Sequence, residues 1–398
     1  MKRIVRALSA CAVMLLIGWY CIPQVYRLLH LPDVVEQRDL TSAPTLELRQ
    51  NDARFVRESG DERLNGGSVR IALFGILPIK TVSVFSDARS VVLGGEAVGV
   101  VLKTQGVQIV GFEKVDTSHG SVCPAASAGL REGDMICAIN GKAVVDTDSF
   151  VLLCADAPGT CELSCIRNGE TFNATLKTET DRNGEKKIGA WVRDSTSGIG
   201  TLSFYDRESR AFAALGHGVT DVDTGKLIAP AAGFLTTAVI REIRRGTGDS
   251  AGELIGSFSV HAEDAIAKVD RNTAFGISGT LISFPITNEK SADIAPNAAV
   301  HRGNAYILST VDGTVSAYSV EVIRIDVQSS RETQGVMIEI TDPVLLSKTG
   351  GIVQGMSGSP LIQDGRLIGV VTHVFISQPT RGYCLYADRM ARELLPVG

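Results

Sequence analysis

A short glycine-rich run near the C-terminus, Gly355 to Pro360 (GMSGSP), is the strongest constraint on this chain of 398 residues. It places Ser357 in a tight turn directly before the apolar pair Leu361-Ile362. Glycines let the backbone bend sharply, so that a hydroxyl stays exposed and nearby N–H groups can face an oxyanion. Such runs also occur in ordinary turns, so the motif alone predicts only a candidate nucleophile.

A serine nucleophile needs an imidazole base, and two of the six histidines stand in credible positions. His217 lies between glycines in the run ALGHG, at the end of an apolar strand, where its ring can be presented to a cleft. His373 lies inside a predicted strand that follows the nucleophile turn. We expect His217 to be the base, with His373 as the alternative.

A carboxylate usually orients such a base, and Asp342 is the best-placed candidate. It ends a predicted strand over residues 337–341 and lies fifteen positions before the candidate nucleophile. Asp221 and Asp223, close after the candidate base, are alternatives. A purely structural aspartate that caps the turn after it would have the same sequence pattern.

The N-terminus has the pattern of a membrane anchor. Basic residues precede a mostly apolar run over residues 7–22, and the bulky residues that follow do not resemble a cleavage site. We therefore expect an uncleaved anchor over residues 1–24 that holds the body outside the cytoplasm. A polar, flexible stalk is expected over residues 25–68, and a small β region over residues 69–95.

Residues 96–180 contain the signature of a peptide-binding module. The run AGLREGDMICAING, from Ala128 to Gly141, ends in an Asn-Gly hairpin turn and closely resembles a PDZ domain. The resemblance implies that an extended peptide adds to a sheet edge while a nearby loop holds its terminal carboxylate. It places that loop at Ala97, Val98, Gly99 and Val100. A spacer with an empty groove is the alternative.

Residues 181–398 are expected to form the final domain. A polar hinge at residues 181–187 precedes short alternating segments that glycines separate, and no long helical period occurs before Ala387. This pattern predicts a pair of β-barrels, so the fold class of the chain is mainly β.

Composition and cysteine spacing argue against several kinds of ligand. The net charge is −5 with no long basic block, which gives no reason to expect nucleic acid. Five of the eight cysteines lie between residues 123 and 165, without the spacing or the histidines of a zinc site. We expect no metal, no cofactor and mostly buried free thiols, with one disulfide in this cluster as the alternative.

The order of the motifs resembles a known protease family. A PDZ-like module, then ALGHG, then GGIVQGMSGSP and GVVTHVF is similar to the stage IV sporulation protein B (SpoIVB) serine peptidases over nearly the whole chain. The resemblance implies a PDZ domain followed by a chymotrypsin-like double β-barrel, and it maps the catalytic triad onto His217, Asp342 and Ser357. It also ranks Ser357 over Ser359, because Ser357 precedes the Gly-x-Pro of the turn.

The resemblance implies an acyl-enzyme mechanism. Ser357 attacks a peptide carbonyl while His217 removes its proton and Asp342 holds the imidazole. The backbone N–H groups of Gly355 and Ser357 would form the oxyanion hole. The substrate chain would bind along the strand that contains Thr372, His373 and Val374.

The biological role that the resemblance implies is signalling during sporulation. The peptidase would be exported to the space between the forespore and mother-cell membranes. There it would cleave itself and the extracytoplasmic part of a membrane-bound regulator, and so activate late sigma-factor processing. The expected partners are this protein substrate, a PDZ peptide ligand and the membrane. A non-catalytic PDZ scaffold and a general extracytoplasmic quality-control protease are the alternative functions.

Overall fold

The computed structural model describes residues 34–36, 53–58, 66–73 and 77–85, and residues 89–395 except 223, 284–289 and 327–333. The chain divides into two compact units, residues 1–90 with 293–301, and residues 91–292 with 302–398. The expected anchor over residues 1–24 lies outside the described residues, as does most of the expected stalk. No helix in the described ranges is both long and apolar enough to cross a membrane.

The first unit contains a four-stranded sheet in the order β1-β4-β3-β2. Its strands are β1 (Val34–Glu36), β2 (Ala53–Glu58), β3 (Gly66–Leu73) and β4 (Leu77–Phe85). β1 pairs in parallel with β4, and the other pairs are antiparallel. Two of these strands fall within the range expected to be a stalk, and two fall mostly within the expected small β region.

Six strands of the second unit close into a first barrel. They pair in the order β6-β17-β19-β20-β16-β15, and a further pairing of β15 with β6 closes the ring. Their bounds are β6 (Ala97–Phe112), β15 (Ala190–Tyr205), β16 (Ala211–Ala214), β17 (Ala232–Arg244), β19 (Ala267–Thr273) and β20 (Gly276–Leu281). Alternate apolar residues such as Val98, Val100 and Leu102 point into its core, as the period of two along a strand requires.

A second closed barrel has the order β22-β23-β24-β27-β26-β25. Its strands are β22 (Gly303–Ser309), β23 (Ser316–Ile325), β24 (Val336–Ile340), β25 (Pro360–Gln363), β26 (Arg366–Phe375) and β27 (Gln378–Tyr386). Helix α5 (Pro343–Thr349) follows β24, and helix α6 (Ala387–Leu394) packs on strands of both barrels. Two β-barrels and a mainly β chain confirm the predicted fold class.

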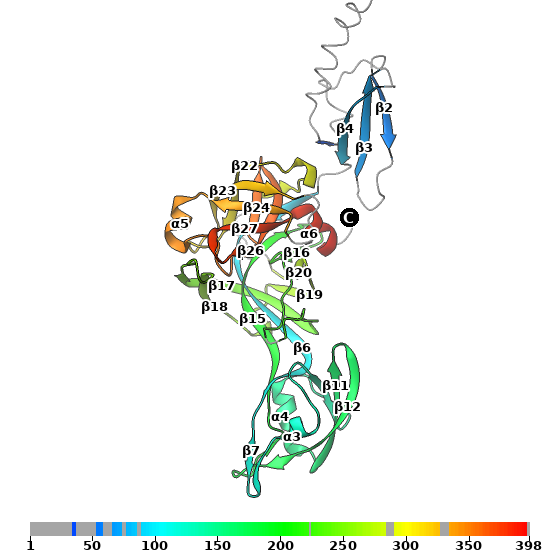
Figure 1. Ribbon diagram of the computed structural model, residues 1–398, viewed down its shortest axis with the longest axis vertical. Helices are drawn as coiled ribbons and strands as arrows, with labels where there is room; N and C mark the ends of the chain where they lie inside the picture. The colour runs from blue at the N-terminus through cyan, green and yellow to red at the C-terminus, as the bar shows by residue number, and fades with distance from the viewer. Residues whose placement is uncertain are drawn as a thin grey trace, which may run out of the picture. The chain divides into compact units, whose positions relative to one another are not determined.

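The PDZ-like module is inserted into the first barrel. Residues 97–103 of β6 pair with residues 195–201 of β15 in the barrel, and residues 108–112 pair with residues 190–193 in the module (Figure 1). The two longest strands of the chain therefore enter and leave the module side by side. The expected domain limits, 96–180 and 181–398, cut across this arrangement, because the first half of β6 belongs to the barrel and the start of β15 belongs to the module.

Between these two strands the module has a small sheet and two helices. Its elements are β7 (Val115–Thr117), β8 (Gly120–Val122), α3 (Pro124–Ser127), β9 (Met135–Ile139), β10 (Lys142–Ala143), α4 (Thr147–Asp156), β11 (Thr160–Arg167), β12 (Glu170–Lys177), β13 (Glu179–Thr180) and β14 (Lys186–Lys187). The Asn-Gly turn between β9 and β10 forms as predicted, with φ of 49° at Asn140 and 74° at Gly141. Helix α4 begins at a capping box in which Asp146 accepts the Ser149 N–H at 2.8 Å.

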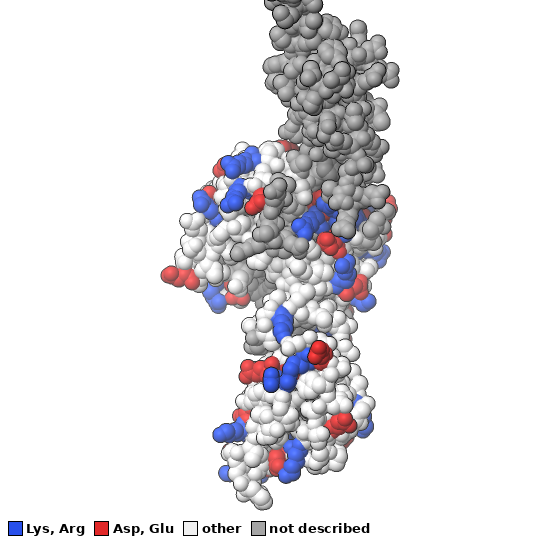
Figure 2. Space-filling view, turned by 45° about the vertical axis from the view of Figure 1, so that its right-hand side comes forward, with Lys and Arg blue, Asp and Glu red and all other residues white. Residues whose placement is uncertain are grey.

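The surface charges and the cysteines of the described residues agree with what the composition predicts. On the face shown in Figure 2, lysines and arginines are interspersed with aspartates and glutamates over the described surface. The six described cysteines, Cys123, Cys137, Cys154, Cys161, Cys165 and Cys384, are free thiols. Burial raises the pKa of Cys154 to about 12, so this side chain remains a neutral thiol that fills the module core.

We predict that the module can be deleted without unfolding the barrel if the deletion keeps the barrel residues of β6 and β15 paired. Lys103 and Ser195 are paired neighbours, so an Asn-Gly turn can replace residues 104–194. Asp221→Asn is included, because Asp221 is 4% exposed and would otherwise lose its ion-pair partner Arg193. A small ester should be hydrolysed within about threefold of the full chain, because no residue of the catalytic cleft described below is removed.

The matched control removes residues 96–180 and therefore the whole of β6, including the part that pairs inside the first barrel. This variant should show no cooperative thermal unfolding by circular dichroism, whereas the 104–194 replacement should. Equal behaviour of the two deletions would contradict the inserted topology.

Candidate active site

The nucleophile turn lies between α5 and β25, and its shape depends on two glycines. Gly355 and Gly358 have φ of 96° and 98°, a region that L side chains rarely adopt. A Cβ at Gly358 would also lie 2.2 Å from the backbone oxygen of Thr201. Both conformation and space therefore demand glycine at this position, as the GMSGSP motif predicts.

The turn presents Ser357 and buries Ser359. Ser357 lines a cleft of about 540 Å³, and its hydroxyl donates a hydrogen bond to the Thr372 carbonyl at 3.1 Å. Ser359 is 0% exposed, and its hydroxyl has no partner within the described part of the chain. Of the two serines, only Ser357 is placed to meet a substrate.

His217 reaches the same cleft from the end of β16 in the first barrel. Leu215 and Gly216 both have left-handed φ values, 72° and 71°, which turn the chain so that the ring enters the cleft. The Nδ1 atom lies 3.0 Å from the Gly218 carbonyl oxygen. Because a carbonyl only accepts, Nδ1 carries the proton in this contact, and Nε2 has a lone pair available to receive one.

The environment keeps this imidazole neutral. Burial lowers the pKa of His217 below its ordinary value of 6.5, and the hydrogen bond to the Gly218 carbonyl opposes that shift only in part. His373, the alternative base, has its ring centroid 5.5 Å from that of His217 but does not line the cleft. A neutral imidazole in the cleft is the protonation state that a general base needs at neutral pH.

Two backbone N–H groups beside Ser357 have no acceptor. The N–H groups of Gln354, Met356 and Gly358 each donate to a backbone carbonyl. Those of Gly355 and Ser357 donate to no acceptor among the described residues, and both residues line the cleft. This alternation leaves two backbone donors without an acceptor among the described residues at the cleft, as an oxyanion hole requires.

The structure does not join Asp342 to His217. The Asp342 carboxylate caps α5, where it accepts the N–H groups of Val344 at 3.0 Å and Leu345 at 2.9 Å. Its second oxygen accepts the Ser319 N–H at 3.3 Å. The expectation that Asp342 orients the base therefore differs from the observed contacts, in which the Gly218 carbonyl orients the ring. A strand-end aspartate before Pro343 has the sequence pattern of both roles, and here helix capping is the observed one.

Asp221, an alternative to Asp342, has other partners in the structure. Asp221 accepts hydrogen bonds from the Thr224 N–H and hydroxyl, both at 2.8 Å, and forms an ion pair with Arg193. Asp223 lies outside the described residues.

The expected substrate strand lies beside the nucleophile. Thr372, His373 and Val374 belong to β26, which pairs along one edge with β27. On the opposite edge β25 pairs as far as Val370, Val371 exchanges backbone hydrogen bonds with Gly358 and Ser359, and the Thr372 carbonyl contacts the Ser357 hydroxyl. These three residues do not line the cleft itself, so their contact with a substrate chain stays a prediction.

The expected PDZ carboxylate loop lies elsewhere in the fold. Ala97, Val98, Gly99 and Val100 form the start of β6 inside the first barrel. Val98 pairs with Gly200 of β15 on one side and with Thr237 of β17 on the other, so neither edge can take a peptide. Val100 lines the catalytic cleft instead. The expectation fails because β6 runs through barrel and module without a break.

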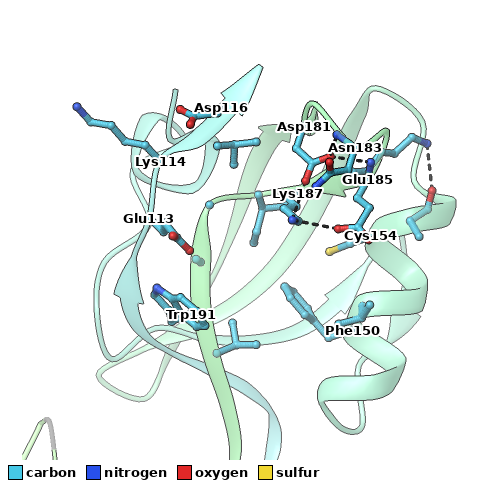
Figure 3. A pocket seen from close by; sticks show the side chains of 18 of the residues that line it. Glu113, Lys114, Asp116, Phe150, Cys154, Asp181, Asn183, Glu185, Lys187 and Trp191 are labelled. Carbon is cyan, nitrogen blue, oxygen red and sulfur yellow. Dashed lines mark hydrogen bonds and ion pairs between the residues drawn. The ribbon is translucent and has the colours of Figure 1, made fainter. Parts of the chain in front are cut away.

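The module has a different groove, between α4 and the start of β15. It encloses about 1190 Å³, and its walls include Phe150, Val151 and Trp191 (Figure 3). At residues 190–193, β15 pairs with β6 on one edge, and no other strand in the described ranges pairs with its second edge. The walls are fixed at both ends, because the Thr147 N–H donates to Asp194 at 2.9 Å and Lys186 Nζ contacts the Ala155 carbonyl at 3.1 Å.

Sequence reasoning missed this groove, although a signal was present. Ile188-Gly189-Ala190-Trp191 places a glycine among apolar residues at the start of a strand, as the run at residues 97–100 also does. Gly189 has φ of 71°, and a Cβ there would lie 2.6 Å from the Glu113 carbonyl oxygen. The N–H groups of Ile188 and Gly189 donate to no backbone acceptor among the residues described.

Comparison with known proteins identifies a peptidase family. A family model described as SpoIVB peptidase S55 matches residues 184–391, slightly more than half of the chain. The PDZ domain of the SdrC-like protein from Listeria monocytogenes is 22% identical, with a TM-score of 0.19, over 23% of this chain and 90% of that chain. The inactive form of a serine-to-alanine mutant of Rv3671c from M. tuberculosis is 14% identical, with a TM-score of 0.27, over 50% of this chain and 84% of that chain.

We predict that the acid limb of the pH profile lies below pH 6.5. As the pH falls through the lowered pKa of His217, the ring gains a proton and can no longer act as a base. The measurement is kcat/KM for a small ester from acid to neutral pH. His373→Gln is the control and should leave the limb in place; loss of the limb in that variant would identify His373 as the base.

We predict that Asp342→Asn keeps most of the activity. Asparagine caps a helix about as well as aspartate, so the free energy of unfolding should be nearly unchanged, whereas Asp342→Ala should lose about 1 kcal/mol. Because Asp342 does not contact His217, kcat for the asparagine variant should fall by less than about tenfold. A fall of about 10⁴ would show that the carboxylate joins the base when substrate binds.

Proposed function

The chain belongs to the SpoIVB peptidase S55 family and is a serine peptidase, and from this membership we propose that it is an endopeptidase of sporulation. It cleaves itself and the extracytoplasmic part of a membrane-bound regulator, and thereby signals from forespore to mother cell to activate late sigma-factor processing. The observation that supports the chemistry is that Ser357 and a neutral His217 line one cleft, together with two backbone N–H groups that have no acceptor among the described residues.

The proposed reaction is acyl transfer through Ser357. A rotation of its side chain moves the hydroxyl from the Thr372 carbonyl to Nε2 of His217, which takes the proton as the oxygen attacks the peptide carbonyl. The N–H groups of Gly355 and Ser357 stabilise the oxyanion, an effect worth about 10²–10³ in rate for each donor. His217 then returns the proton to the leaving amine, and water hydrolyses the acyl-enzyme by the same path in reverse.

The substrate chain binds as an added strand. We propose that it pairs with Thr372, His373 and Val374 along the edge of β26 that lies beyond the β25 pairing. Main-chain pairing requires an extended, unpaired segment. For this reason the proposed self-cleavage lies within residues 23–64 but outside strands β1 and β2.

The proposed location is the intermembrane space of the forespore, with residues 1–24 as the anchor. Basic residues before an apolar run support this orientation. Membership of the peptidase family weighs against the scaffold alternative, because the scaffold needs no nucleophile. The quality-control alternative differs in architecture as well, since such proteases place the PDZ domain after the catalytic domain.

The proposed PDZ ligand is an extended peptide in the groove between α4 and β15. It pairs with the open edge at residues 190–193, and its terminal carboxylate meets the N–H groups of Ile188 and Gly189. The apolar wall formed by Phe150 and Val151 favours an apolar side chain near the end of the peptide.

The test of the proposed function is self-cleavage of the full chain in detergent, followed by intact mass over several hours. Wild type should release N-terminal fragments, and Ser357→Ala should stay intact. Labelling of Ser357 by a peptidyl phosphonate identifies a competent nucleophile independently of cleavage. If wild type neither cleaves itself nor accepts the label, the proposed function is wrong.

We predict that Val151→Lys weakens peptide binding to the module by at least about tenfold, because a charge replaces apolar wall at the groove. Leu152→Lys is the matched control, since Leu152 is 67% exposed on the same helix and does not line the groove. Fluorescence anisotropy with peptides that end in an apolar residue measures both variants. Equal losses in both would place the ligand elsewhere.

A further inference from the structure

Thr201 of β15 connects the first barrel to the nucleophile turn of the second. It is 1% exposed, and its hydroxyl donates a hydrogen bond to the Gly355 carbonyl at 2.7 Å. Its backbone N–H donates to the Ser357 carbonyl at 3.0 Å. Thr201 therefore contacts both of the residues whose N–H groups are the proposed oxyanion donors.

The hydroxyl acts on the glycine of these two residues. The Gly355 N–H shares a peptide plane with the Gln354 carbonyl, which accepts the Leu254 N–H at 2.9 Å. The next plane contains the Gly355 carbonyl, which the Thr201 hydroxyl holds, and the Met356 N–H, which donates to the Val353 carbonyl at 3.1 Å. A glycine at φ of 96° can rotate these two planes against each other at little cost, so a fixed N–H direction requires both to be held.

The backbone of Ser357 is held by hydrogen bonds to other backbone groups. Its N–H shares a plane with the Met356 carbonyl, which accepts the Ser359 N–H at 3.0 Å. Its own carbonyl accepts the Thr201 N–H. Of the contacts that hold these planes, the Thr201 hydroxyl is therefore the one made by a side chain, and the one that a substitution can remove.

Thr201 also contacts the segment that presents the base. Its carbonyl accepts the Leu215 N–H at 3.2 Å, two positions before His217. The same carbonyl oxygen lies against Gly358, where a Cβ would approach to 2.2 Å. The N–H, hydroxyl and carbonyl of Thr201 therefore set the spacing between the turn that carries Ser357 and the turn that carries His217.

We propose that Thr201 is the positioning residue of the oxyanion hole, and that its hydroxyl keeps the Gly355 N–H directed into the cleft. The inference rests on Ser357 as the nucleophile of the proposed function. Without the hydroxyl, the peptide between Gly355 and Met356 keeps only the contact of the Met356 N–H with the Val353 carbonyl at 3.1 Å among the described residues, so Gly355 can shift and its N–H loses its fixed place beside the Ser357 N–H. The loss appears in the transition state, where the oxyanion exists, and not in binding of the substrate.

The test compares Thr201→Val and Thr201→Ser in the full chain. Valine has nearly the size of threonine but no hydroxyl, and serine keeps the hydroxyl. For a small ester, Thr201→Val should lower kcat by about 10- to 100-fold at an unchanged KM, and Thr201→Ser should stay within about threefold of wild type. A peptide boronate, which forms a tetrahedral adduct with the nucleophile, should bind Thr201→Val more weakly by the same factor as kcat falls.

Thr236→Val is the matched control. Thr236 lies on β17 of the same barrel, is 1% exposed, and donates its hydroxyl to the Ser259 carbonyl at 2.8 Å, outside the cleft. The Thr236→Val substitution should lower the thermal midpoint of unfolding about as much as Thr201→Val does, but it should leave kcat and boronate binding unchanged. If the two valine variants lose kcat equally, or if serine fails to restore it, Thr201 has only a structural role.

Three further outcomes are distinguished. If Thr201→Val does not unfold cooperatively, Thr201→Cys replaces it, because a thiol of similar size is a weak donor and should show the same selective loss of kcat. If wild type does not hydrolyse the ester and Ser357 takes no phosphonate label, the proposed function has failed. If wild type is active, Ser357→Ala is inactive and Thr201→Val is unimpaired, only the present inference has failed.

Discussion

The antiparallel pairing of β6 with β15 is the interaction on which the rest of this structure depends. It closes the first barrel, and its continuation forms two strands of the inserted module. The same strand pair brings Thr201 to the nucleophile turn. A catalytic site divided between two barrels needs such a fixed contact, because displacements of about 1 Å at reacting groups already cost rate.

The local parts of the site could be predicted from the sequence. Ser357, Gly355 and His217 belong to short glycine-rich runs whose conformations are set within a few residues, and the structure places all three at one cleft. The Asn-Gly turn of the module is another local signal that forms as predicted. Alternating apolar segments and the lack of long helical periods were enough to predict a mainly β chain.

The parts that depend on distant pairing could not be predicted. The pattern at residues 97–100 predicts a strand but not its partners, which lie about a hundred residues further along the chain. For this reason the PDZ loop was expected there, although the open edge is at residues 190–193 of β15. Asp342 shows the same limit. An aspartate that caps a helix and an aspartate that orients an imidazole can have the same sequence pattern. Only the observed hydrogen bonds from the N–H groups of Val344 and Leu345 distinguish the two roles.

The insertion of the module between two adjacent strands has a consequence for how the barrel folds. Lys103 and Ser195 pair directly, yet about ninety residues separate them, so closing the barrel from an unstructured chain would require a slow and entropically costly loop closure. The module removes that cost if it folds first, because its own pairing of Ile109 with Val192 brings the two strands into register at the entrance to the barrel. The module then serves as the turn of one very long hairpin, and the order of folding is encoded in the order of the strands.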